Sequence, residues 1–145
     1  MPDDLDSKIL RMLQKDAKLT YEQIGEALER SPSTIRDRIK RMEEDRIILG
    51  YSAIVDATRL GIKADAFVSA DIDQSQSGRA VAELMTLKNV SEILHLTGER
   101  RVLIRVRAAS NQELMEIVDW KIRPLGFSNI EITMVLDTVL RYPGI

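Results

Sequence analysis

The chain has 145 residues, a formal net charge of -2, no cysteine and a single histidine. It is long enough for one ordinary domain or two small ones. The composition excludes disulfides and thiolate metal sites, and one histidine argues against a histidine-based metal site or a Ser-His-Asp triad. The acidic start MPDDLDSKIL lacks an apolar signal segment, and no apolar run reaches the roughly 18 residues of a membrane span. We therefore expect a cytoplasmic protein with no membrane partner and no cofactor.

Two helices are predicted before residue 30. The first carries apolar residues at helical spacing, namely Leu5, Ile9, Leu10, Met12 and Leu13. The second opens with a capping-box pattern, in which Gln23 follows Thr20 by three residues. Gly25 inside this helix costs up to about 1 kcal/mol relative to alanine. We expect the close approach of another helix to compensate for it.

A third helix is predicted from Ser31, as N-cap, and Pro32, at the first helical position. Its apolar stripe consists of Ile35, Ile39 and Met42. Only a few residues around Arg30 separate it from the second helix, which is the spacing of a helix-turn-helix. Small hydroxyls at its N-terminal end and cations on its outer face suit a DNA major groove. The alternative interpretation is a solvated charged face without a partner.

The pattern changes after residue 50. Residues 51–62 are predicted to form a short strand and a connector, and the order that follows is strand, helix, strand, strand, helix, strand. The strands are ADAFVSADID, SEILHLT, RVLIRVR and IEITMVLDTVL. One helix runs from about Ser77 to Leu87, and the other opens with a capping box at Ser110 and Glu113. This βαββαβ order is the ferredoxin-like arrangement, an antiparallel sheet with both helices on one face.

Taken together, these features resemble the Lrp/AsnC (leucine-responsive, feast/famine) family of transcription regulators. The segments that carry the resemblance are LDSKILRMLQKDAKLTYEQIG, SPSTIRDRIKRMEEDRIILGYSAIVD, LTGERRVLIRV and PLGFSNIEIT. The resemblance implies an α+β chain with a winged-helix-like helix-turn-helix DNA-binding domain in residues 1–50 and a connecting strand and linker in 51–62. Residues 63–145 are then a ferredoxin-like effector and oligomerisation domain of the type called RAM. The implied partners are double-stranded DNA and a second copy in a homodimer formed through the sheets, with further assembly to a tetramer or octamer.

The resemblance places the DNA contacts on the third helix. Contacts to bases are assigned to Ser33, Thr34, Arg36 and Asp37, and contacts to phosphates to Arg38, Lys40 and Arg41. Asp37 either accepts from a cytosine amino group or orients Arg36 or Arg41 through a local ion pair. The local pair is the commoner arrangement, because charged neighbours on a helix pair readily.

Two segments that border the family's effector pocket supply the predicted effector site: Thr97, Gly98, Glu99, Arg100, Arg101, Gly126, Phe127 and Thr133. A free amino acid needs an acceptor for its ammonium group and donors for its carboxylate. The family has an aromatic residue and an aspartate where this chain has Arg100 and Arg101. Glu99 is then the alternative acid, whereas the two arginines favour an anionic effector. In the remaining interpretation the loop binds nothing and only mediates assembly.

The turn before the third helix also departs from the family. Family members have glycine followed by an apolar residue where this chain has Glu29 and Arg30. If the turn keeps a left-handed backbone, we expect Glu29 to bear about 1 kcal/mol of strain.

The strand RVLIRVR places Arg105 and Arg107 on the same sheet face as Arg101. Acidic residues of the first and last strands, such as Asp71 and Glu131, are expected on the polar side of the sheet. Opposite charges on paired strands pair within the chain or across a dimer.

The main alternative function is a ferredoxin-like small-molecule sensor, enzyme or assembly protein whose N-terminal helices bind no specific DNA. The sequence has no nucleophile–base pairing, phosphate-binding glycine loop or metal cluster, so we expect no enzymatic activity. A third hypothesis is a regulator that has no effector and responds only to its own concentration and assembly.

Overall fold

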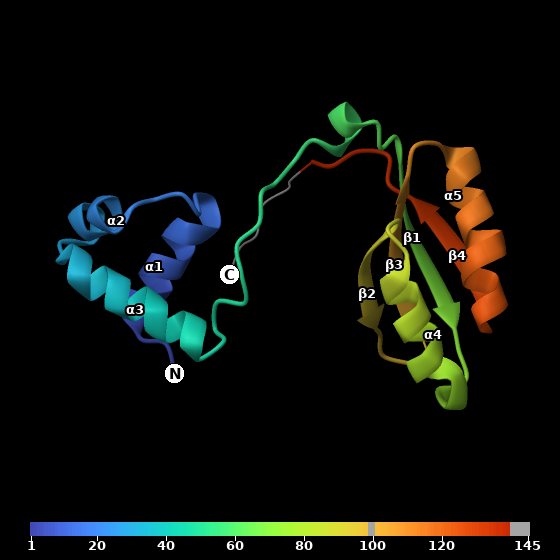
Figure 1. Cartoon of the computed structure of the whole chain (residues 1–145), viewed down its shortest axis with the longest axis horizontal. Coiled ribbons are helices and arrows are strands. Elements are labelled where there is room, and N and C mark those ends of the chain that lie inside the picture. Colours follow the sequence, from blue (N-terminus) through green and yellow to red (C-terminus); the bar gives the residue numbers. More distant parts are fainter. Residues whose placement is uncertain (99–100, 140–145) are drawn as a thin grey trace. The chain divides into compact units, whose positions relative to one another are not determined.

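The computed structural model describes residues 1–98 and 101–139. These residues form two compact units, an N-terminal unit (Met1–Ile54) and a C-terminal unit (Val55–Thr138), which Figure 1 shows in colours from blue to red. None of the helices in the described part of the chain combines the length and the apolar character that crossing a bilayer requires.

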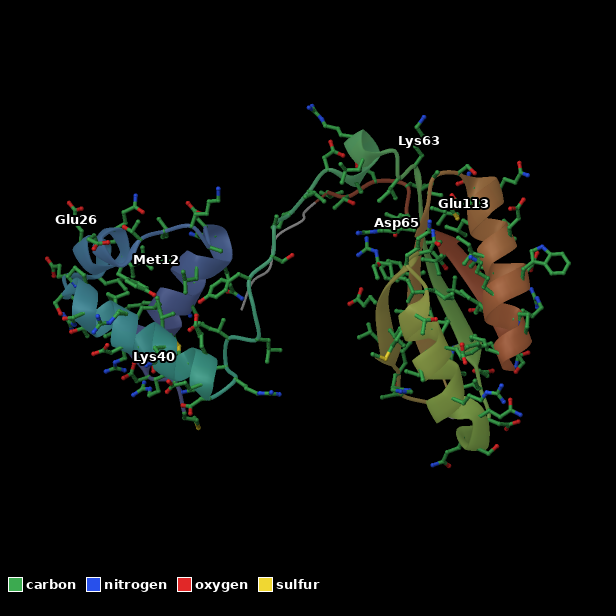
Figure 2. All side chains as sticks on the ribbon, in the orientation of Figure 1. Met12, Glu26, Lys40, Lys63, Asp65 and Glu113 are labelled. Carbon is green, nitrogen blue, oxygen red and sulfur yellow. The ribbon has the colours of Figure 1, made fainter. Side chains whose placement is uncertain are left out.

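The N-terminal unit is built from α1 (Asp4–Lys15), α2 (Tyr21–Leu28) and α3 (Pro32–Glu44), which confirms the three predicted helices. Thr20 caps α2 in the predicted capping box, and the Ser31 hydroxyl accepts from the Thr34 amide at the start of α3. The fully or almost fully buried core of this unit is Ile9, Ile24, Ile35, Ile39 and Met42. Met12 of α1, labelled in Figure 2, packs against this cluster.

The turn between α2 and α3 keeps a left-handed backbone although glutamate stands where the family has glycine. Glu29 lies at φ 54° and ψ 49°, a conformation that L side chains adopt at a cost. The prediction that a neighbouring helix approaches Gly25 was wrong. A β-carbon at Gly25 would lie 2.5 Å from the carbonyl oxygen of Arg30, so the turn backbone, and not a neighbouring helix, requires glycine there.

The short strand predicted after residue 50 is absent from the described structure. Residues 51–56 are irregular, and Ala57–Leu60 form a short 3-10 helix that ends at Gly61 with φ 79°. A strand exists only where a neighbouring strand pairs with it. None of the strands described in this chain pairs with residues 51–56.

The C-terminal unit has the predicted βαββαβ order. Its elements are β1 (Ala64–Asp71), α4 (Gln74–Thr86), β2 (Val90–His95), β3 (Arg101–Ala108), α5 (Asn111–Ile117) and β4 (Ser128–Met134). The described strands form one antiparallel sheet in the order β2-β3-β1-β4. The helix α4 begins three residues before the predicted start, and β4 ends at Met134, well before the predicted end of the last strand.

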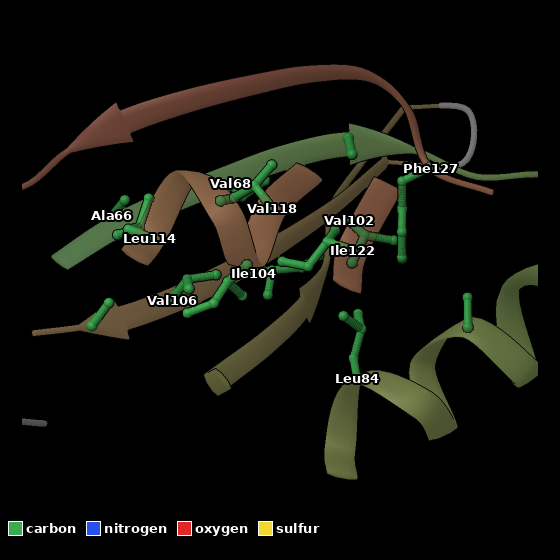
Figure 3. Close-up of a cluster of buried hydrophobic side chains, with 14 of the residues drawn as sticks. Ala66, Val68, Leu84, Val102, Ile104, Val106, Leu114, Val118, Ile122 and Phe127 are labelled. Atoms are coloured by element: carbon green, nitrogen blue, oxygen red, sulfur yellow. The ribbon is translucent and has the colours of Figure 1, made fainter. Parts of the chain in front are cut away.

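Both helices cover one face of this sheet. Figure 3 shows Leu84 of α4 and three residues that follow β3, Leu114, Val118 and Ile122, gathered around the inward side chains of the central strands. Those side chains are Ala66, Val68, Val102, Ile104 and Val106, and each is at most 1% exposed. The strict alternation of burial along β1 and β3 leaves the other face of the sheet without a helix. The ferredoxin-like prediction is therefore confirmed.

The second helix of this unit is less regular than its apolar stripe predicts. After α5 the backbone passes through a π turn at Val118–Ile122 and a 3-10 turn at Arg123–Leu125. The Ser110 hydroxyl accepts from the Glu113 amide, 3.1 Å away, but the Glu113 carboxylate accepts from the amide of Ala109. The predicted capping box is thus formed in one direction only.

The strain in the turn can be tested with the same glutamate-to-glycine substitution at two positions, 26 and 29. Glu29→Gly relieves a left-handed side chain and is expected to stabilise the protein by about 0.5–1 kcal/mol. Glu26→Gly, on the exposed side of α2, is expected to destabilise it by about 1 kcal/mol. The free energy of unfolding in urea measures both. Equal signs for the two variants would contradict the account of this turn.

Candidate DNA-binding and effector sites

The outer face of α3 presents the residues predicted to contact bases. Ser33, Arg36 and Asp37 are exposed, and Thr34 is half-buried, on the side of the helix away from its buried stripe. The hydroxyls gather around the N-cap, because the Ser31 Oγ lies 2.7 Å from the Oγ of Thr34 and 3.1 Å from that of Ser33. The N-terminal end of α3 therefore presents a compact group of donors and acceptors.

Arg36 and Asp37 form the predicted local pair. The Nε and Nη2 atoms of Arg36 both lie 3.1 Å from one carboxylate oxygen of Asp37. Such solvent-exposed pairs contribute about 0–1 kcal/mol, so a base edge or phosphate can replace this contact at low cost. Lys40, labelled in Figure 2, is also exposed, and its Nζ is 3.8 Å from a carboxylate oxygen of Glu44.

The other two cations of α3 contact a buried acid on α1. Asp6 has no exposed surface, and its two carboxylate oxygens lie 3.2 Å from Arg38 Nη1 and 2.8 Å from Arg41 Nη2. Arg38 also contacts the carboxylate of Asp3, and this hydrogen bond is the main reason why the pKa of Asp3 is lowered. The prediction of phosphate contacts treated these arginines as free cations. In the structure both are paired with acids from the start of the chain.

This cluster was missed in the sequence, although a signal for it exists. Asp3 is the N-cap of α1, and Asp6 three residues later completes a capping box, with N–O distances of 2.9 and 3.1 Å. The spacing is the one that identified the start of α2.

The residues after α3 return to its C-terminal end. The Tyr51 hydroxyl donates to Glu43 at 2.7 Å. The pKa of Tyr51 is raised to about 12, mainly by burial and secondly by this hydrogen bond. A groove of about 800 Å³ lies beside this segment, lined mainly by apolar residues such as Leu10, Leu13 and Ile48. The segment after α3 is therefore tied back to the last turn of α3 within the N-terminal unit.

The predicted effector residues lie in the hairpin after β2, in the segment just before β4, and within β3 and β4. Thr97 and Gly98 belong to the hairpin after β2, where Gly98 has φ 105°, whereas Glu99 and Arg100 lie outside the described residues. Gly126 has φ 102°, and a side chain there would meet the amide of Gln76. Phe127 is 4% exposed and packs in the core, so its ring has a structural role.

Thr133 does not join the hairpin residues within one chain. It pairs with Phe67 on β1, whereas Arg101 pairs with Asp71, four residues further along the same strand. At about 3.3 Å per residue, this separation is about 13 Å. Within one chain, the predicted effector site is therefore formed only in part, at the end of the sheet near Arg101.

Arg101 is a strand residue whose charge is compensated. Its guanidinium lies 3.1 Å from Asp71 and 3.0 Å from Glu131, and it approaches Ser69 at 3.4 Å. Asn129 donates to Asp71 at 2.8 Å, and this bond, with that of Arg101, lowers the pKa of Asp71. Two carboxylates therefore surround the Arg101 guanidinium, whereas Arg100, the other arginine of the expected anion site, lies outside the described residues, so an anionic effector stays a prediction.

The uncovered face of the sheet holds a second ion-pair cluster. Asp65 accepts from Arg105 at 3.0 and 2.8 Å and from Arg107 at 3.3 Å, and Arg105 lies over the Phe67 ring at 5.0 Å from its centre. Of the two interpretations of these arginines, pairing within the chain is the one observed. Burial raises the pKa of Asp65, but the arginines more than offset it and the pKa is lowered. Leu103 shares this face.

No group of three or more histidine, cysteine or acidic side chains in residues 1–98 and 101–139 is arranged to hold a metal ion. The N-terminal unit is a three-helix domain whose last two helices form a helix-turn-helix, and the C-terminal unit is a ferredoxin-like α+β domain. With these two domains, the chain belongs to the class of two-domain helix-turn-helix proteins.

Comparisons with known proteins identify the family. Residues 3–43 match the AsnC-type helix-turn-helix domain, and residues 65–145 match the Lrp/AsnC ligand binding domain. The chain is 31% identical over 139 residues to the HTH-type transcriptional regulator Ptr1 of Methanocaldococcus jannaschii, covering 95% of this chain and 94% of that protein. The chain therefore belongs to the Lrp/AsnC family of helix-turn-helix transcriptional regulators.

Solved structures agree with this assignment. The structure of E. coli AsnC has a TM-score of 0.85 and 26% identity, with 97% of this chain and 96% of that chain covered. A transcriptional regulator from Neisseria meningitidis, solved as a complex with L-Met, has a TM-score of 0.91 at 22% identity, with 100% and 96% covered. The latter comparison supports the fold alone.

The Asp65 cluster makes a prediction about pH. Because its pKa is lowered in the folded protein, Asp65 contributes stability that is present above its ordinary value of 3.8 and is lost as the pH falls through the lower folded value. Asp65→Asn is expected to lower the free energy of unfolding by roughly 1–3 kcal/mol at pH 7, with a difference that shrinks toward pH 3. Urea unfolding at both pH values measures this. The exposed Asp137→Asn is the control, and a pH-independent loss in Asp65→Asn would contradict the assignment.

Proposed function

We propose that this protein regulates transcription in the cytoplasm by placing α3 in the major groove of double-stranded DNA. The observation that carries the proposal is the outer face of α3, where exposed hydroxyls and cations lie opposite a fully buried apolar stripe. A helix with this arrangement, preceded by a tight turn and a second helix, suits recognition of base edges.

The residues of α3 divide into two roles. Ser33, Thr34, Arg36 and Asp37 face the base edges, with Arg36 exchanging its contact to Asp37 for an acceptor on guanine. Arg38, Lys40 and Arg41 contact phosphates. Lys40 is the most exposed of these three side chains, and it acts as a charge that does not depend on base sequence.

The partner of the uncovered sheet face is a second copy of the chain. This face carries Phe67 and Leu103, and toward its β2 edge Leu94 and Leu96, each 41% exposed, beside ion pairs that are already satisfied. Such a surface can be covered without leaving an unpaired charge. A two-fold dimer reads pseudo-palindromic sites with half-sites about one helical turn apart, or multiples of it. Dimers then assemble to a tetramer or octamer.

The effector of this regulator is an amino acid bound near the Arg101 end of the sheet, with Thr97 and Gly98 of the hairpin beside it. Residues 65–145 match the Lrp/AsnC ligand binding domain, and the Neisseria meningitidis regulator of similar fold was solved with L-Met, so we infer the same class of ligand for this chain. In this chain, Asp71 and Glu131 supply two carboxylates against the single described guanidinium of Arg101. This balance favours a ligand with an ammonium group over a simple anion.

Two substitutions on α3 test the division between base and phosphate contacts. Arg36→Ala is expected to weaken specific binding by about 1–3 kcal/mol and to relax sequence preference, whereas Lys40→Ala lowers the salt slope by about 1. Binding to a duplex selected by the wild type from a random pool, measured across salt concentrations, distinguishes them. A Lys40→Ala protein with altered sequence preference and an unchanged slope would contradict the proposed roles.

A thermal-shift screen tests the effector. Amino acids at millimolar concentration are expected to raise the unfolding midpoint, because a ligand of the folded state stabilises it. An N-acetylated amino acid, which lacks the ammonium group, and small anions such as phosphate are the controls and are expected to have no effect. Equal stabilisation by phosphate, or none by any amino acid, would count against an ammonium-binding site.

A further inference from the structure

Asp6 is the one charged residue in the described chain whose side chain is completely buried. A buried carboxylate without cationic partners is strongly unfavourable, so Asp6 requires the two arginines that contact it. We propose that Asp6 is a positioning residue, which holds the Arg41 guanidinium in place for a contact with the DNA backbone. The inference rests on the proposed DNA-binding function of α3.

The contact between Asp6 and Arg41 joins a buried carboxylate to a side chain that is largely exposed. Its Nη2 lies 2.8 Å from an Asp6 oxygen with no exposure, while the Arg41 side chain as a whole is 51% exposed. A guanidinium has five N–H donors in a planar fork. Asp6 takes one edge of this fork from inside the unit, and the exposed remainder is available to a phosphate.

Arg38 completes the cluster without sharing this role. Its side chain is only 28% exposed, and its Nη1 atom contacts both Asp6 and Asp3. Arg41 follows Arg38 by three residues on the same flank of α3. The more enclosed arginine balances the buried charge, and the more exposed one is oriented by it.

Preset orientation has a consequence for binding. Immobilising a flexible side chain at an interface costs binding free energy, and a side chain that is already held avoids part of this cost. Asp6 touches no DNA in this proposal and acts only through Arg41. Its acidity would by itself oppose DNA binding, so a positioning role and a purely electrostatic role predict changes of opposite sign on its removal.

Asp6→Asn keeps the size of the side chain and the oxygen position that accepts from the Asp3 amide and from Arg41 Nη2, but it removes the negative charge that holds Arg41 and turns an amide N–H toward Arg38. We expect it to weaken binding to the selected duplex about three- to tenfold at moderate salt and to lower the salt slope by about 0.9, the value for one phosphate contact. Arg41→Gln is expected to do the same, and the double variant to bind no worse than Arg41→Gln alone. Thermal melting and circular dichroism establish that each protein is folded in the assay.

Asp3→Asn is the matched control. It makes the same change of charge at Arg38, leaves Asp6 and Arg41 in contact, and retains a good N-cap, because asparagine caps helices as well as aspartate does. Its binding is expected to be unchanged or slightly tighter. Tighter binding by Asp6→Asn, or effects of Asp6→Asn and Arg41→Gln that multiply in the double variant, would overturn the proposal.

A second variant tests the proposal even if Asp6→Asn does not fold. Arg41→Lys keeps the charge, but an ammonium group has no planar fork to join Asp6 and a phosphate. We expect it to lose as much of the salt slope as Arg41→Gln, and retention of the wild-type slope would overturn the positioning role. Absence of salt-dependent binding by the wild type would instead count against the proposed function itself.

Discussion

In each unit, the main element, α3 or the sheet, buries only one of its faces, and the rest of the structure depends on this constraint. In the N-terminal unit, α3 gives Ile35, Ile39 and Met42 to the core and leaves its opposite side in solvent. In the C-terminal unit, alternate residues of β1 and β3 enter a core beneath α4 and α5, and the other half of each strand lies on a face without helices. The surfaces proposed to bind DNA and a second copy are the parts that these cores leave uncovered.

The arginines of the two units illustrate how burial sets the value of a charge. Arg36 and Asp37 are both exposed, so their pair contributes little and is easily exchanged for another partner. The pairs of Asp65 are less exposed, and removal of the acid leaves two arginines short of a partner. Asp6 is the extreme case, because a carboxylate with no exposure cannot turn to solvent. The described arginines of β3, Arg101, Arg105 and Arg107, therefore do not form a cationic surface, because each of them contacts a carboxylate.

Most of the secondary structure follows from local signals, and the errors arose where a distant partner decides. The capping pattern at Thr20 and the N-cap at Ser31 specify helix starts, because each bond joins residues three apart. Residues 51–56 have the composition of a strand but no described strand beside them. Gly25 was correctly identified as a site of close approach, but the approaching group, the carbonyl of Arg30, depends on how the turn folds back. The separation of Thr133 from Arg101 within one chain likewise depends on the register of β4 on β1, and the place of Thr133 in an effector site stays a prediction.

The sequence by itself determined the order of most elements and the face of α3 that is exposed, because these depend on periodicity and on short-range capping. The family came from resemblance, and the left-handed backbone at Glu29 was expected only on the condition that the family's turn is kept. Only the tertiary structure decided which charged residues far apart in the sequence become partners. Asp6 meets Arg38 and Arg41 across more than thirty positions of chain, and Asp65 meets Arg105 across forty. Such pairs depend on helix packing and strand register, which residue spacing does not specify.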